Sequence, residues 1–155
     1  MNTLTSRKRL SIGMIVLVIF MIGPSLFADD GANHQVRNQH FGVSGGNVND
    51  ITRAFCCSGT LGSLVTDGST GYVLSNNHVL GRSDQAVAGE DISQPGMIDT
   101  GCRPQTIVAD FTLASPLGSN VDAAIAELRT GTMDATGFIE DIGVPGSVAA
   151  ATVGL

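Results

Sequence analysis

His78 and Asp122 are the two residues of this sequence whose types and surroundings best fit proton-transfer chemistry. His78 stands in the segment SNNHVL at residues 75–80, and Asp122 stands in the segment NVDAAIA at residues 120–126. A histidine takes up and returns a proton near neutral pH, and a carboxylate behind its ring holds the tautomer and stabilises the imidazolium. We therefore identify the pair as candidate catalytic residues, provided that the fold brings them together.

The sequence predicts no cofactor and no metal site. The histidines His34, His40 and His78 are not spaced as the ligands of a metal-binding knuckle are. The formal net charge is −6, and the only lysine, Lys8, lies near the N-terminus, so the rest of the chain is more acidic still. An acidic surface repels phosphate backbones, which argues against nucleic acid as a partner.

The three cysteines are Cys56, Cys57 and Cys102. Adjacent cysteines rarely bridge each other because the geometry is strained. In an oxidising compartment we therefore expect Cys102 to pair with either Cys56 or Cys57, which leaves one thiol free. The alternative is that all three are reduced and act as small apolar side chains.

Residues 1–28 have the layout of a secretory signal peptide. A basic start at residues 7–9 is followed by a nearly unbroken apolar run at residues 12–22 and by Ala28 at a plausible cleavage point. The run is shorter than the roughly 20 residues that span a bilayer, which favours cleavage over an uncleaved anchor. In both cases we expect export, secreted or periplasmic, and only the anchor, residues 12–28, would touch a membrane.

Short apolar segments between glycine-rich turns predict an all-β barrel or sandwich. Residues 29–53 are polar and lack apolar periodicity, which indicates a flexible lead-in or a surface loop. The apolar stretch at 61–65 and the apolar run at 72–74, which residues 76–80 follow, flank an Asp-Gly turn at 67–71, which is a hairpin signal. Residues 105–113 are a further β-rich run.

Residues 122–129 are ambiguous. The segment VDAAIAELR, which includes the preceding Val121, favours a helix by propensity, but its length also suits a buried strand. We place the single folded domain at residues 54–143 and a short apolar tail at residues 144–155.

From about residue 44 to residue 142 the chain resembles the N-terminal half of a trypsin-like serine peptidase of the chymotrypsin fold. It is most similar to bacterial relatives of the plant Narrow Leaf trypsin-like proteins. In trypsin-like enzymes a Cys-x-Gly-(Ser/Thr)-Leu strand precedes the catalytic histidine, and a Val-Asp-hydrophobic-Ala segment follows with the catalytic aspartate. The segments that match are CSGTLG at 57–62, SNNHVL, the QPG turn at 94–96 and NVDAAIA. SNNHVL departs from the commoner Ala-Ala-His-Cys form, so the disulfide usually found beside that histidine is absent.

The resemblance implies a six-stranded antiparallel Greek-key barrel of the chymotrypsin type. It implies that the second barrel, which carries the serine in a Gly-Asp-Ser-Gly-Gly loop, is largely missing. Ser147 lacks the glycines that follow such a serine. Ser44 lies in the string GVSGG at 42–46 but precedes His78, and we predict a structural role for it.

The resemblance also implies that His78 and Asp122 are the catalytic pair of an exported serine endopeptidase acting on protein or peptide substrates. Without the nucleophile we expect this chain to be inactive alone. One alternative is a non-catalytic binding or scaffold module that keeps the fold. The other is a half-enzyme completed by a partner chain that carries the second barrel.

Overall fold

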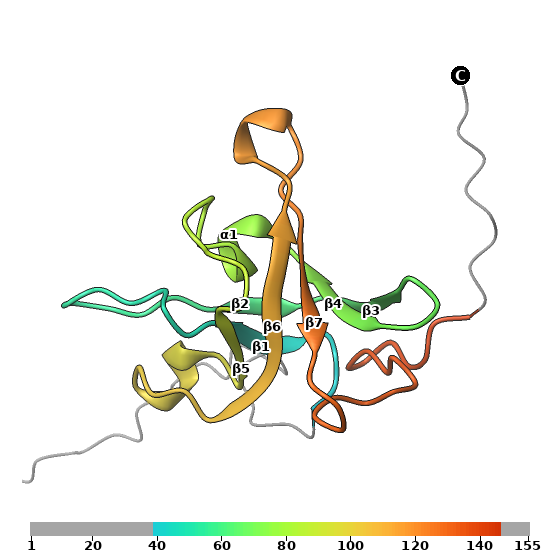
Figure 1. Ribbon diagram of the computed structural model, residues 1–155. Helices are drawn as coiled ribbons and strands as arrows, with labels where there is room; N and C mark the ends of the chain where they lie inside the picture. Colours follow the sequence, from blue (N-terminus) through green and yellow to red (C-terminus); the bar gives the residue numbers. More distant parts are fainter. Residues whose placement is uncertain (1–38, 147–155) are drawn as a thin grey trace, which may run out of the picture.

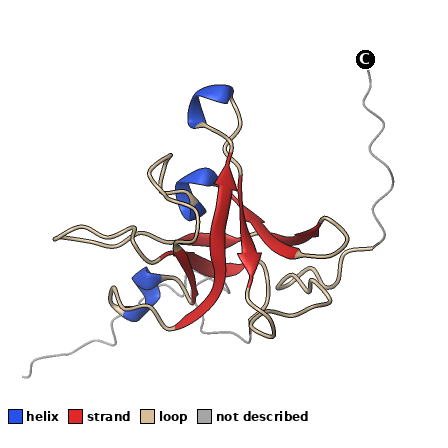
Figure 2. Ribbon diagram, in the orientation of Figure 1, coloured by secondary structure: helices blue, strands red, loops and turns tan. Residues whose placement is uncertain are grey.

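Seven antiparallel strands account for most of the regular structure of this protein and form one nearly closed barrel (Figures 1 and 2). A computed structural model describes residues 39–146. The strands lie in the spatial order β2-β1-β5-β6-β7-β4-β3. Their bounds are β1 Val43–Asn47, β2 Gly59–Leu61, β3 Ser63–Thr66, β4 Gly71–Ser75, β5 Asp91–Gln94, β6 Thr106–Ala114 and β7 Ala124–Leu128. The prediction of an all-β barrel is confirmed at this level.

Gly62 closes the barrel, because it is the single residue between the two edge strands β2 and β3. A Cβ atom at this position would lie 2.7 Å from the carbonyl oxygen of Leu74, closer than such atoms pack. Glycine lacks that atom, so the chain can turn tightly against β4 as it passes from one edge of the sheet to the other.

The predicted hairpin is confirmed as the pair β3 and β4, with Ser63 opposite Leu74 and Thr66 opposite Gly71. In its turn the Asp67 carboxylate accepts the backbone N–H groups of Ser69 and Thr70 at 2.9 Å. The apolar run after β4 does not continue as a strand. It forms the short helix α1, Asn77–Leu80, which contributes Val79 and Leu80 to the core.

The prediction of an irregular lead-in at residues 29–53 is wrong for residues 43–47. They form β1, whose five residues are all buried between β2 and β5. The strand lacked an apolar signal because it contains two glycines. A Cβ atom on Gly45 would lie 2.5 Å from Leu61, so a larger residue does not fit there. The barrel therefore begins at Val43, ahead of the domain boundary expected at residue 54.

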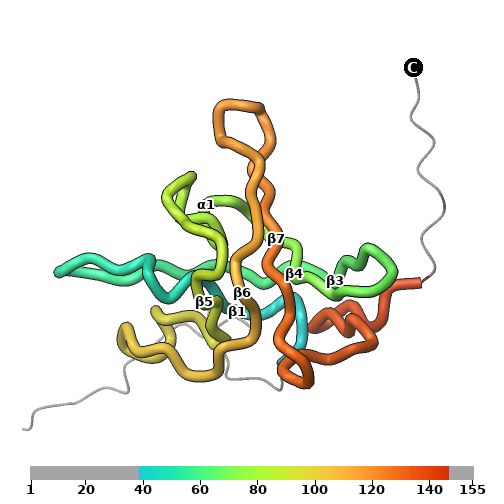
Figure 3. The backbone as a smooth tube through the Cα atoms, viewed as in Figure 1, coloured from blue at the N-terminus to red at the C-terminus, as the bar shows by residue number. Residues whose placement is uncertain are grey.

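The ambiguous segment at residues 122–129 contains a strand, β7, which pairs with β4 on one side and with β6 on the other. β6 and β7 form a long hairpin whose connecting loop extends beyond the barrel next to α1 (Figure 3). That loop contains the short 3₁₀ helix η3, Leu117–Ser119. Another 3₁₀ helix, η2, Met97–Thr100, lies between β5 and β6.

Cys102 is bonded to Cys56, which decides between the two pairings left open by the sequence. Cys57 is exposed and free. Between residues 39 and 146 no helix is long and apolar enough to cross a membrane. The predicted signal segment 1–28 and the tail from residue 147 onward lie outside the described residues.

Candidate active site

The register between β4 and β7 brings His78 and Asp122 together. Ser75, the last residue of β4, lies opposite Ala124, the first residue of β7. His78 follows Ser75 on helix α1, and Asp122 precedes Ala124 at the end of the β6–β7 loop. Both side chains therefore start from the same end of the same strand pair.

Asp122 contacts His78 at two points. Its Oδ2 lies 2.5 Å from the ring Nδ1, and its Oδ1 accepts the backbone N–H of His78 at 3.2 Å. The backbone of Asn77 is a further, smaller cause of the lowered pKa of this carboxylate. The side-chain amide of Asn76 donates to the Asp122 carbonyl at 3.0 Å, which ties the two segments once more. Both residues predicted from the sequence are thus in direct contact.

The protonation of the pair follows from these contacts. The hydrogen bond from the His78 side chain is the largest influence on the pKa of Asp122, and it holds that pKa below the usual value against a smaller, opposing effect of desolvation. An ionised carboxylate only accepts, so the hydrogen between the two groups belongs to Nδ1. In the neutral ring Nε2 is then left unprotonated and able to accept a proton.

The pair is open to solvent, with side-chain exposures of 56% for His78 and 37% for Asp122. Beside His78 lies a hollow of about 360 Å³. It is lined by Asp50, Cys57, Ser58, His78, Val79, Arg82, Ser83 and Gln85. A small group or a peptide side chain can reach the ring from this side. A more apolar hollow of about 400 Å³, lined by Leu64 and Leu128, lies at the opposite ends of β4 and β7 and is remote from the pair.

Cys57 does not supply a ready nucleophile to this hollow. Desolvation, and to a lesser extent the nearby charge of Asp50, raises the pKa of its thiol. The reactive form of cysteine is the thiolate, and a raised pKa keeps the group in the thiol form at neutral pH.

Ser44 lies in β1 and is 5% exposed. Its hydroxyl donates to the Asp99 carboxylate and accepts the backbone N–H of Gly96 at 2.9 Å, so both of its functions are used inside the barrel wall. Ser147 lies outside the described residues. Within residues 39–146 no serine hydroxyl hydrogen-bonds the ring of His78; Ser58, which lines the hollow, donates to the carbonyl of Cys57.

The other described histidine does not join the pair. His40 Nδ1 lies 3.3 Å from Glu140 Oε2, and this contact ties the chain before β1 to the segment after β7. In the part of the chain that the structure describes, no three His, Cys, Asp or Glu residues are grouped so that they would hold a metal ion.

Sequence reasoning missed the side chains that surround the pair. Asn77 is fully buried, and its amide contacts Asp84 and the carbonyl of Ser115. The Asn-Asn dipeptide in SNNHVL could have indicated a role for Asn77, since the commoner trypsin-like motif has two alanines at these positions. Asp84 carried no signal of its own, because its contact with Leu117 joins residues that are 33 positions apart in the sequence.

Comparisons with protein-family models, with curated proteins and with solved structures found no match for this chain. A function for the chain is therefore argued from the residues of the site and from the motifs around them.

Proposed function

We propose that this chain is the histidine–aspartate half of an exported trypsin-like serine endopeptidase. His78 is the general base and then the general acid, and Asp122 orients its ring. The observation that carries the proposal is the two-point contact, in which one carboxylate holds both the ring Nδ1 and the backbone N–H of His78. The backbone contact fixes the carboxylate beside His78, and the ring contact then sets the direction of the ring, as a catalytic histidine requires.

The reaction is acyl transfer. A serine hydroxyl attacks the carbonyl carbon of the scissile peptide bond while Nε2 of His78 takes the hydroxyl proton. The resulting imidazolium is stabilised by Asp122, and it then gives the proton to the leaving amine as the bond to carbon breaks. The serine and the backbone donors for the oxyanion belong to a second barrel, and each such donor is worth about 3–4 kcal/mol of transition-state stabilisation.

The strand order supports the finer fold expected from the resemblance. Counting β2, Gly62 and β3 as one bent strand turns the seven strands into six. The first three of these are joined in order and pair with their neighbours, and β5 then returns to lie beside β1. That arrangement is a Greek key. We propose that the barrel is the six-stranded Greek-key barrel of the chymotrypsin type.

The test is reconstitution with a second barrel. The coding DNA past Leu155, or a neighbouring gene, is read for a segment with a Gly-Asp-Ser-Gly-Gly-type serine, and that segment is produced with the full chain. We expect a fluorophosphonate probe to label the serine of the second segment only in the presence of this chain, and His78→Ala to abolish the labelling. Labelling of the isolated chain at Ser44, Ser58 or Ser83 would contradict the proposal.

A non-catalytic binding module is the second candidate, and exposed apolar side chains favour it. Three apolar side chains are at least half exposed: Ile51 (50%) and Phe55 (60%) on the β1–β2 loop, and Ile98 (56%) on η2. The Cys56–Cys102 disulfide joins these two segments. The same surface would seat a second-barrel partner chain. Peptide binding that is unchanged in His78→Ala and needs no second segment would favour the module.

A further inference from the structure

The side chain of Asn77 links α1, which carries His78, to the β6–β7 loop, which carries Asp122. It is fully buried on α1, directly before His78. Its Nδ2 donates to Asp84 Oδ1 at 2.5 Å and to the Ser115 carbonyl at 2.7 Å, and its Oδ1 accepts the Asp84 backbone N–H at 3.1 Å. The amide nitrogen and the amide oxygen are therefore both used: two of the three bonds reach Asp84 and the third reaches Ser115, both outside α1.

On one side the amide holds a strained turn. Arg82, Ser83 and Asp84 have φ angles of 50°, 54° and 69°. Left-handed backbone is costly for residues other than glycine, and three in succession persist only where surrounding contacts impose them. Asn77 hydrogen-bonds both the backbone N–H and the carboxylate of Asp84, the last residue of this run. Arg82, the first residue of the run, forms an ion pair with Glu90 at 2.8 Å.

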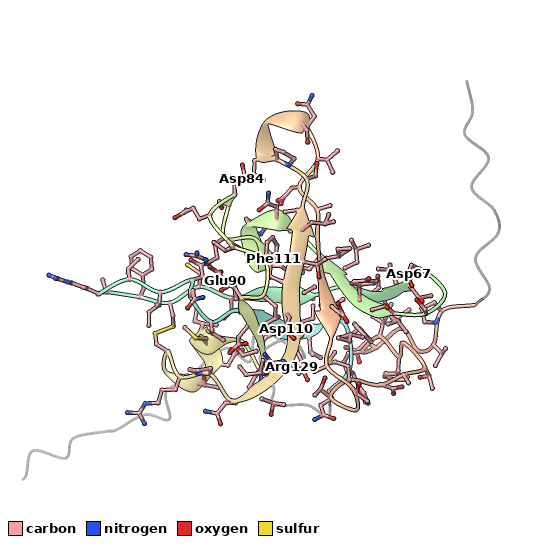
Figure 4. The ribbon with its side chains drawn as sticks, in the orientation of Figure 1. Asp67, Asp84, Glu90, Asp110, Phe111 and Arg129 are labelled. Atoms are coloured by element: carbon pink, nitrogen blue, oxygen red, sulfur yellow. A yellow bond between two sulfur atoms is a disulfide. The ribbon has the colours of Figure 1, made fainter. Side chains whose placement is uncertain are left out.

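On the other side the same groups hold the loop that carries Asp122. The Asp84 carboxylate accepts the Leu117 backbone N–H at 3.2 Å, and Asn77 binds the Ser115 carbonyl. The backbone N–H of Ser115 in turn donates to the Ala123 carbonyl at 2.8 Å, next to Asp122. Figure 4 shows Asp84 beside α1 and below the β6–β7 loop, and Asp67 away from both on the β3–β4 turn.

We propose that Asn77, acting through Asp84, is the positioning residue that sets the separation of His78 and Asp122. Neither residue touches a substrate; both act through the backbone segments from which the pair projects. The inference rests on the proposed function, because positioning of the pair affects catalysis only if the pair is catalytic. The geometry of the pair itself can be measured without catalysis.

The experiment uses the full chain and compares three variants by NMR. Asp84→Ala removes the carboxylate that receives Asn77 and Leu117, and Asp84→Asn keeps an acceptor oxygen in the same place. Asp67→Ala is the matched control, since Asp67 is also an exposed aspartate that caps a turn. The two readouts are the titration of the Asp122 carboxyl and the exchange rate of the His78 Nδ1–H with water.

In Asp84→Ala we expect the pKa of Asp122 to rise toward the ordinary value of about 3.9. We also expect exchange of the ring proton to accelerate roughly tenfold, which is the effect of weakening a charged hydrogen bond. Asp67→Ala should leave both readouts near those of the parent protein, and Asp84→Asn should leave the exchange rate near the parent's without raising the pKa of Asp122. Loss of the Asp84 charge alone would lower the pKa of Asp122, because it removes a like charge, so a rise reports displacement of the pair.

A folded Asp84→Ala protein whose Asp122 titration and ring-proton exchange match those of Asp84→Asn would overturn the positioning role. A parent protein in which Asp122 titrates at its ordinary value and the ring proton is unprotected would overturn the proposed function as well. The barrel amide signals, which report the fold of each variant, make the two results distinguishable.

Discussion

The carboxylate of Asp122 accepts the ring Nδ1–H of His78 with one oxygen and the backbone N–H of the same residue with the other. The second contact matters because it couples the position of the ring to the position of its own backbone. His78 follows β4 and Asp122 precedes β7, and these neighbouring strands are paired up to Ser75 and Ala124. The register of the barrel wall therefore brings the two segments that carry the pair together.

The hydrogen bond within the pair should break at acid pH. The pKa of Asp122 is lowered in the folded chain, chiefly by the bond from His78. A group of this kind contributes stability above its unfolded pKa, about 3.9, and loses that contribution as the pH falls through the lower folded value. NMR should show the His78 Nδ1–H signal retained at pH 5 and lost together with protonation of Asp122. Asp122→Asn should remove this transition, and an unchanged acid transition in that variant would contradict the assignment.

Once the chain is completed by a second barrel, Asp122→Asn should lower kcat by about four orders of magnitude, as the same change does in a comparable protease. The amide donates where the carboxylate accepted, so it favours the wrong ring tautomer. Peptide hydrolysis by the reconstituted enzyme measures the effect. Asp110→Asn is a suitable control, because Asp110 pairs with Arg129 on the barrel wall, as Figure 4 shows, and should keep most of the activity.

Gly62→Ala should destabilise the barrel by about 1–3 kcal/mol, the usual cost of overpacking. The added methyl group would lie 2.7 Å from the backbone oxygen of Leu74, which cannot move without disturbing β4. Urea unfolding measures the change. Gly118→Ala is the control, because nothing lies within 4 Å of a Cβ atom there, and it should stay within about 0.5 kcal/mol of the parent protein. Equal effects of both substitutions would argue against Gly62 as the closure point.

Loss of the disulfide by Cys102→Ala should lower the free energy of unfolding by about 2–5 kcal/mol. Cys56 and Cys102 are separated by 46 residues, so the bond restricts a large part of the unfolded chain. Thermal unfolding with and without reductant measures the effect. Cys57→Ser should change stability by no more than about 0.5 kcal/mol, because Cys57 is free and exposed. A parent protein whose Tm does not respond to reductant would contradict the prediction.

Sequence reasoning failed at β1 and left the cysteine pairing open, because both depend on how the chain packs in three dimensions. The sequence of β1 does not indicate a strand, because it contains glycine, which has a low strand propensity. Position 45 must nevertheless be glycine, since the side chain of Leu61 packs directly against it. The choice between Cys56 and Cys57 depends on which side chain faces inward. Successive side chains of an extended segment point to opposite sides, and it is Cys56 that is buried.

The amino-acid sequence by itself determined the class of the fold, the β3–β4 hairpin and the identity of the candidate pair. Each of these depends on local patterns, namely short apolar segments, turn residues and the flanks of His78 and Asp122. Only the tertiary structure decided that residues 124–128 form a strand, since the pairing with β4 and β6 outweighs a near-equal local preference for helix. It also decided the role of Asn77, because an amide becomes a structural link only when burial places Asp84 and Ser115 within its reach.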